Sequence, residues 1–165
     1  MFSGELIHDA ERLIEHLRSA GLTIATAESC TGGLIAGLLT EIPNSSQVLD
    51  RGFVTYSIAA KTEMLGVDPS MIANLGAVSR EVAIAMAEGA IMHSKADVAV
   101  AVTGLAGPGG GTIAKPVGLV HISVARRNAT PMHEEHRFGN KSRSDVRSLT
   151  IAAALNLVRR SCSFA

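Results

Sequence analysis

The chain has 165 residues with 15 basic and 15 acidic side chains, so its formal net charge is zero. This balance provides no general attraction for nucleic acid or for an anionic membrane. Aromatic residues make up 3% of the chain, which disfavours a platform for stacking single-stranded nucleic acid. At this length a single domain over residues 1–165 can bury a sufficient core without disulfides or metals.

The cysteines and the first residues indicate the compartment. Cys30 and Cys162 lie far apart and form no C-x-x-C pair, so neither a zinc site nor a disulfide framework is predicted. The N-terminal residues are acidic rather than basic, unlike a signal peptide, and no apolar run approaches the length of a membrane span. We therefore expect a soluble, cytoplasmic protein with no membrane partner.

Helix and strand patterns alternate along the chain. Short apolar runs predict strands at 22–27, 51–56, 97–103, 117–125 and 132–138. Helices are predicted before Gly21, over about 31–40, from Ser57 to Gly66, from Asp68-Pro69, from Ser79 to about 94, and at the C-terminal end. The last strand is the most polar, which places it at a sheet edge. This order predicts a three-layer α/β/α sandwich with a mostly parallel mixed sheet of about five strands, in which ligands bind at the carboxyl ends of the strands.

The most informative segment is the junction between the first strand and the helix after it. It holds an acid, three candidate nucleophiles and two glycines, namely Glu28, Ser29, Cys30, Thr31, Gly32 and Gly33. Backbone N–H groups and the helix dipole at such a junction attract anions and stabilise developing negative charge. An ordinary turn with a Ser or Thr cap has the same pattern. Spacing alone does not rank the three nucleophiles.

A glycine-rich loop follows the third strand and contains Thr103, Gly104, Gly107, Gly109 and Gly110. Its glycine order is G-x-x-G-x-G, no Gly-Lys-Ser/Thr follows, and it leads to a strand rather than a helix. Neither a Walker A loop nor a dinucleotide fingerprint is therefore predicted. The loop is either a flexible hairpin connection or one wall of a small-ligand site with backbone amides as donors.

A serine nucleophile needs a base, and a neutral lysine in an apolar setting can serve. Lys61 follows the second strand, on a helix that could reach across the cleft, and Tyr56 could orient or relay a proton there. The alternatives are a solvated helix lysine and an ordinary tyrosine at a strand end. The sequence keeps both interpretations open.

Two arginines and two histidines near the C-terminal end are further candidates for ligand binding. Arg143 and Arg147 are four residues apart and share one helix face, where they would suit phosphate recognition or simply carry surface charge. His133 and His136 would face opposite sides of a strand. We therefore predict no metal site.

Together these segments closely resemble the C-terminal domain of the CinA (competence-damage-inducible) family, over almost the whole chain. The motifs that carry the resemblance are TAESCTGG (26–33), RGFVTYS (51–57) with Lys61, GV (66–67), GAVS (76–79), TGLAGPGG (103–110) and KPVG (115–118). The resemblance implies an amidohydrolase without cofactor that converts the carboxamide of nicotinamide mononucleotide to nicotinic acid mononucleotide and ammonia, in pyridine nucleotide recycling.

The resemblance also implies roles for individual residues. Ser29 is the expected nucleophile, Lys61 its base and Tyr56 an assisting group, with an acyl-enzyme that water resolves. Substrate contacts are expected from the two glycine-containing segments and the two arginines, that is from Glu28, Cys30, Thr31, Gly32, Gly33, Thr103, Gly104, Gly107, Gly109, Gly110, Arg143 and Arg147. Just before the last helix, the segment 138–143 departs from the family pattern, because it is shifted and lacks the usual acid.

The alternative to an enzyme is a non-catalytic module that senses nucleotides or binds proteins, in keeping with the family's link to competence and DNA damage. The presence of Ser29, Tyr56 and Lys61 together favours the enzyme. A thiol amidase based on Cys30 is disfavoured, because the pattern offers no histidine partner. The expected partner is a small nucleotide substrate, and homo-oligomerisation stays open.

Overall fold

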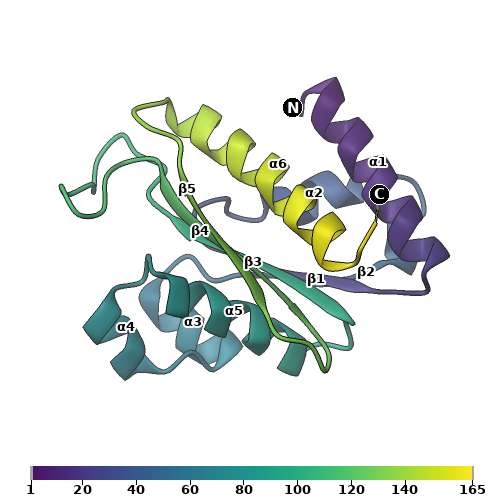
Figure 1. The fold of residues 1–165 in the computed structure, drawn as a ribbon, viewed down its shortest axis with the longest axis horizontal. Coiled ribbons are helices and arrows are strands. Elements are labelled where there is room, and N and C mark those ends of the chain that lie inside the picture. Colours follow the sequence, from purple (N-terminus) through teal and green to yellow (C-terminus); the bar gives the residue numbers. More distant parts are fainter. Residues whose placement is uncertain (1, 165) are drawn as a thin grey trace.

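A five-stranded sheet runs through the centre of the molecule, and helices cover both of its faces (Figure 1). The computed structural model describes residues 2–164. The strands are β1 (Ile24–Glu28), β2 (Leu49–Val54), β3 (Val98–Gly104), β4 (Leu119–Arg126) and β5 (Met132–Arg137), in the spatial order β2-β1-β3-β4-β5. The strands β2, β1 and β3 are parallel, and β4 runs antiparallel to both of its neighbours. The predicted α/β sandwich with a mixed sheet is confirmed, as is the edge position of the polar last strand.

Two groups of helices form the outer layers. One face carries α1 (Gly4–Ser19), α2 (Leu34–Thr40) and α6 (Arg143–Ser161), and the other carries α3 (Ile58–Leu65), α4 (Pro69–Leu75) and α5 (Arg80–Met92) (Figure 1). A short 3-10 turn at Ser45–Gln47 connects α2 to β2. Alternate residues of each strand point to opposite faces. In β3 the valines pack beneath the first group and the alanines beneath the second. Both faces of this central strand are therefore buried from solvent.

The predicted starts of the helices after Ser57, at Asp68-Pro69 and after Ser79 are confirmed, and each start is capped by a local hydrogen bond. The side chains of Ser57, Asp68 and Ser79 accept hydrogen bonds from backbone N–H groups in the first turns of α3, α4 and α5. The helix predicted from about residue 31 begins later, at Leu34. Gly32 and Gly33 adopt positive φ values of 60° and 93°, so the chain makes a left-handed turn before it becomes helical.

The parallel strands bring three loops to one edge of the sheet. Glu28 at the end of β1 pairs with Val54 of β2 and with Val102 of β3, so the segments after these strands emerge side by side. These are the turn at 29–33, the segment that enters α3, and the glycine-rich loop. Within residues 2–164, no helix has the length and apolar character needed to cross a membrane.

The close contact between α5 and α3 yields a test of the packing. A Cβ atom added to Gly89 would overlap the carbonyl oxygen of Leu65, which is backbone and cannot move aside. We expect Gly89→Ala to lower the free energy of unfolding by about 1–3 kcal/mol, as overpacking does. The matched control is Gly37→Ala in α2, where the new Cβ would lie 3.9 Å from Phe2. This variant should gain about 0.5–1 kcal/mol from helix propensity in the same urea titration.

Candidate active site

Ser29 and Lys61 are in direct contact at the carboxyl edge of the sheet. Lys61 Nζ lies 3.0 Å from Ser29 Oγ and 2.7 Å from the carbonyl oxygen of Thr55. The Ser29 N–H donates to the carbonyl of Val102 in β3 at 3.1 Å, which fixes the residue just beyond the end of β1. The two residues are far apart in sequence, and the parallel pairing of β1 with β2 brings them together.

The Lys61 side chain is buried although it carries an amine. Its exposed fraction is 1%. Because burial disfavours the ammonium form, the pKa of Lys61 lies below its ordinary value of 10.5. A larger fraction of the amine is therefore neutral near physiological pH than for a solvated lysine. A neutral amine 3.0 Å from a hydroxyl can accept its proton, which is the arrangement that an activated serine requires.

Among the described residues, neither of the two other candidate nucleophiles is hydrogen-bonded to the Lys61 amine. Cys30 is buried, and this burial raises the pKa of its thiol to about 11, so the reactive thiolate is scarce. The Thr31 hydroxyl is buried as well and donates to the Glu28 carboxylate at 2.6 Å. The structure thus ranks Ser29 ahead of its neighbours on physical grounds, whereas their spacing in the sequence does not.

Glu28 lies beneath the turn rather than on its open side. Its side chain is fully buried, and both carboxylate oxygens accept hydrogen bonds from the turn, from Thr26 and from the first residues of α2. The side chain was expected among the substrate contacts. Its position instead assigns it to the architecture of the turn. Gly32, by contrast, is exposed at the open side.

Two arginines from the start of α6 reach into this edge. Arg143 donates to the Tyr56 hydroxyl oxygen at 2.8 Å and to the Gly107 carbonyl at 2.8 Å. Arg147 donates to the Thr31 carbonyl at 2.9 Å. The shifted segment before α6 therefore does not remove Arg143 from the predicted site. Together the two side chains join α6 to the turn, to Tyr56 and to the glycine-rich loop.

The glycine-rich loop is tethered, which the sequence pattern did not predict. The Thr103 hydroxyl donates to the carbonyl of Ala77 at 2.8 Å. Lys115 Nζ donates to the carbonyls of Leu75 and Val78 at 2.6 and 2.7 Å. Lys115 was part of a recognised motif, but its sequence neighbourhood gives no sign of this distant contact.

The glycines of the loop occupy two different settings. Gly104 has no room for a side chain, because an added Cβ would lie 2.8 Å from the Leu119 carbonyl oxygen. Gly107 is buried and receives the hydrogen bond from Arg143. Gly109 and Gly110 lie in the exposed part of the loop. The base of the loop therefore belongs to the site region, and its tip faces solvent.

The histidines of β5 take part in two separate clusters. His133 lies 3.0 Å from a ring nitrogen of His121 on β4, whereas His136 contacts Glu134, which pairs with Arg160 of α6. The prediction that they face opposite sides of the strand is confirmed. Among the described residues, no group of three or more His, Cys, Asp or Glu side chains is arranged to hold a metal ion.

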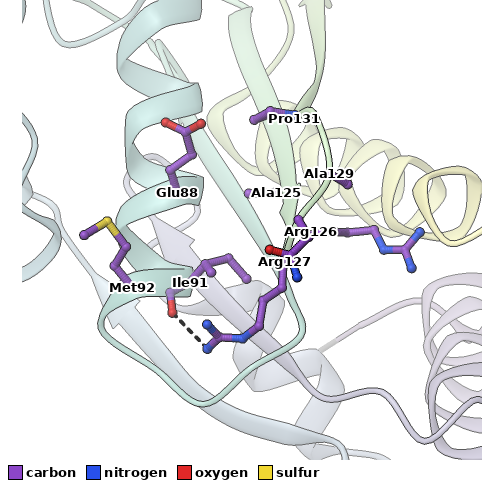
Figure 2. A pocket seen from close by; sticks show the side chains of 9 residues that line it. Glu88, Ile91, Met92, Ala125, Arg126, Arg127, Ala129 and Pro131 are labelled. Carbon is purple, nitrogen blue, oxygen red and sulfur yellow. Dashed lines mark hydrogen bonds between the residues drawn. The ribbon is translucent and has the colours of Figure 1, made fainter.

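A hollow of about 500 Å³ lies elsewhere, between α5 and the turn that joins β4 to β5 (Figure 2). Figure 2 shows Arg127 folded back toward the Ile91 carbonyl. The same guanidinium also binds the carbonyls of Ser94 and Ala96. These bonds tie the end of α5 to the sheet. Neither Ser29 nor Lys61 lines this hollow. The candidate site is therefore identified by the chemistry of its side chains and not by the size of a cavity.

The sequence model of the CinA C-terminal domain matches residues 7–162. The chain belongs to the CinA C-terminal domain family. A CinA-like protein from Mycolicibacterium gilvum is 54% identical over 145 residues, which are 87% of this chain and 34% of the relative. Another from Akkermansia muciniphila is 51% identical over 140 residues, 85% of this chain and 34% of the relative. The chain thus spans about a third of the length of the curated relatives it matches.

Solved structures of the CinA family share the fold over nearly the whole chain. The competence/damage inducible protein CihA from Agrobacterium tumefaciens has a TM-score of 0.94 at 51% identity and covers 96% of both chains. A CinA superfamily protein from Escherichia coli has a TM-score of 0.88 at 31% identity, with 96% of this chain and 92% of that chain covered. The arrangement of strands and helices is therefore that of the CinA family.

The buried lysine of this CinA domain should make the free energy of unfolding depend on pH. Between the lowered native pKa of Lys61 and 10.5, the unfolded chain binds more protons at this position than the folded chain does. The free energy of unfolding of the wild type, relative to Lys61→Met, should therefore rise with pH across this window and be flat below it. Urea titrations of both proteins, from neutral pH up to the ordinary lysine value, measure this difference. The exposed Lys95 supplies a control variant, Lys95→Met, which should leave the slope unchanged; a pH-independent difference for Lys61→Met would contradict the expectation.

Proposed function

We propose that this CinA domain is an amidohydrolase that converts the carboxamide of nicotinamide mononucleotide to nicotinic acid mononucleotide and ammonia. The observation that carries the proposal is the buried Lys61 amine 3.0 Å from the Ser29 hydroxyl. Such a pair performs acyl transfer. The resemblance to the CinA family supplies the substrate, and the two arginines at the site suit its phosphate.

In the proposed reaction, Ser29 Oγ attacks the carboxamide carbon while Lys61 accepts the hydroxyl proton. The tetrahedral intermediate then collapses, the C–N bond breaks, and Lys61 returns the proton to the departing amine, so that ammonia leaves and an ester to Ser29 remains. Water attacks this ester with Lys61 again as the base. The acid departs and Ser29 is regenerated.

Stabilisation of the oxyanion requires free donors near Ser29. The N–H of Gly32 is already bonded to the Ser29 carbonyl, and that of Gly33 to Glu28. The remaining donors of this turn are the N–H of Thr31 and the N–H of Cys30, which contacts its own thiol, and we assign both to the oxyanion. A lost donor of this kind lowers the rate by about 100- to 1,000-fold.

Tyr56 is poised to assist because of its bond to Arg143. The guanidinium donates to the phenol oxygen, so the phenol hydrogen stays available for a further partner. The side chain is 61% exposed and can reach a bound substrate. We assign it to orienting the carboxamide or its leaving group.

The phosphate of the substrate needs positive charge that no acid neutralises. Among the described residues, neither Arg143 nor Arg147 forms an ion pair with a carboxylate. Arg147 lies against the open turn, since its Nη2 would be 3.4 Å from a Cβ placed on Gly32. Among the described residues, Arg143 already donates to two groups, Tyr56 and Gly107, whereas Arg147 donates only to the Thr31 carbonyl. We therefore assign the phosphate chiefly to Arg147.

The catalytic proposal is tested by ammonia release from nicotinamide mononucleotide. We expect the wild type to release ammonia, Ser29→Ala and Lys61→Ala to lose at least about 1,000-fold in kcat, and Cys30→Ala to retain most activity. A wild type that binds the nucleotide without releasing ammonia would instead support the nucleotide-sensing module. Loss of activity in Cys30→Ala with survival of Ser29→Ala would show that the nucleophile is misassigned.

The phosphate assignment is tested by comparing the mononucleotide with nicotinamide riboside, which lacks the phosphate. Because a hydrogen bond to a charged group contributes about 1.5–3 kcal/mol, Arg147→Met should raise KM for the mononucleotide by about 10-fold or more. The KM for the riboside should change little. Arg160→Met on the same helix is the control, since Arg160 pairs with Glu134. An equal rise in KM for both substrates would contradict the assignment.

A further inference from the structure

We propose that Glu28 is a positioning residue, which holds the 29–33 turn from inside so that the Ser29 hydroxyl meets the Lys61 amine. The inference rests on the proposed function for its kinetic readout. Glu28 is the last residue of β1 and directly precedes Ser29. A small displacement of this residue is therefore transmitted to the nucleophile at once.

The carboxylate of Glu28 is saturated with hydrogen bonds. Five groups donate to its two oxygens, namely Thr31 Oγ1 (2.6 Å), the N–H of Gly33 (3.1 Å) and the N–H of Ile35 (3.0 Å) to Oε2, and Thr26 Oγ1 (3.1 Å) and the N–H of Ala36 (2.9 Å) to Oε1. A buried carboxylate is stable only when its oxygens are satisfied in this way. With no exposed surface and both oxygens engaged, Glu28 is not placed to touch substrate.

The carboxylate also replaces the missing cap of α2. The residue at the cap position is Gly33, which has no side chain to accept the free N–H groups of the first turn. Glu28 accepts those of Gly33, Ile35 and Ala36 from below, and its charge suits the positive end of the helix. The turn is therefore fixed between β1 and α2 at the residues that flank Ser29.

The backbone of Glu28 reaches the other member of the pair. Its carbonyl oxygen accepts the N–H of Thr55 at 2.8 Å, and the Thr55 carbonyl in turn accepts from Lys61 Nζ at 2.7 Å. Glu28 thus precedes Ser29 directly in the chain, and its backbone binds Thr55, the residue whose carbonyl accepts from Lys61. One residue sets both ends of the 3.0 Å contact between hydroxyl and amine.

The test is Glu28→Gln, which keeps the shape but has only one acceptor oxygen. Its amide N–H₂ group must face either the N–H of Ala36 or those of Gly33 and Ile35, so the turn shifts locally. Because small misplacements of reacting groups cost about 100-fold, we expect kcat to fall by about 10- to 100-fold. KM, and the affinity for the product nicotinic acid mononucleotide measured by calorimetry, should stay within about 3-fold of wild type, since the phosphate is assigned to Arg147 on α6, which lies outside the turn.

A second variant guards against a general loss of folding. Thr31→Val removes only the 2.6 Å bond to Glu28 and should lower kcat less, again without raising KM. Asp97→Asn is the matched control, because the Asp97 carboxylate accepts from Thr23 N and Oγ1, each at 2.9 Å, at the opposite end of β1. It makes the same change from carboxylate to amide beside the residue that precedes β1, and it should leave kcat near wild type even where thermal unfolding shows a similar loss of stability.

Unchanged kcat in Glu28→Gln would overturn the inference, and so would an equal loss of kcat in Asp97→Asn or a loss of product affinity as large as that of kcat. A fluorophosphonate that labels activated serines separates this inference from the proposed function. If the wild type releases no ammonia but Ser29 is labelled, slower labelling in Glu28→Gln still supports the positioning role, and equal labelling overturns it. A wild type that is neither active nor labelled overturns both.

Discussion

The contact between the Lys61 amine and the Ser29 hydroxyl is the interaction on which the rest of the site depends. An ammonium group is costly to bury, so burial lowers the pKa of Lys61 and increases the fraction of the neutral amine that can accept a proton. The Ser29 hydroxyl and the Thr55 carbonyl then determine where the nitrogen lies. Burial shifts the protonation equilibrium of Lys61 toward the free amine, and the contacts at the sheet edge orient that amine toward Ser29. Neither is sufficient without the other.

The remaining polar groups keep this contact in place by binding backbone atoms of other elements. Glu28 is surrounded by donors of the turn and of α2. Arg143 joins α6 to Tyr56 and to the glycine-rich loop, and Lys115 joins the same loop to the last residue of α4 and to the segment that follows it. Because these bonds link elements on both faces of the sheet, the site is part of the fold rather than of one flexible loop. Hydrogen bonds between these elements, rather than the packing of aromatic side chains, therefore define the shape of the candidate site.

Much of the fold could be predicted from the sequence, because its signals are local. The caps at Ser57 and Ser79 join residues only three apart, and the apolar runs of the strands are read directly from the chain. The start of α2 was predicted too early, since two glycines with positive φ postpone the helix. Glu28 was expected among the substrate contacts, and its buried position could not be predicted because a carboxylate is buried only where several donors converge.

The sequence by itself determined the order of the elements, the edge of the sheet at which a site would form, and the residue types gathered there. Through its motifs it also determined the CinA resemblance, which the family match bears out. Only the tertiary structure decided which of three adjacent nucleophilic side chains meets a base, and which of the charged groups face inward. The physical reason is that reactivity here depends on burial and on contacts between residues far apart in the chain, such as Ser29 with Lys61 and Tyr56 with Arg143. No local pattern of residues encodes these distances.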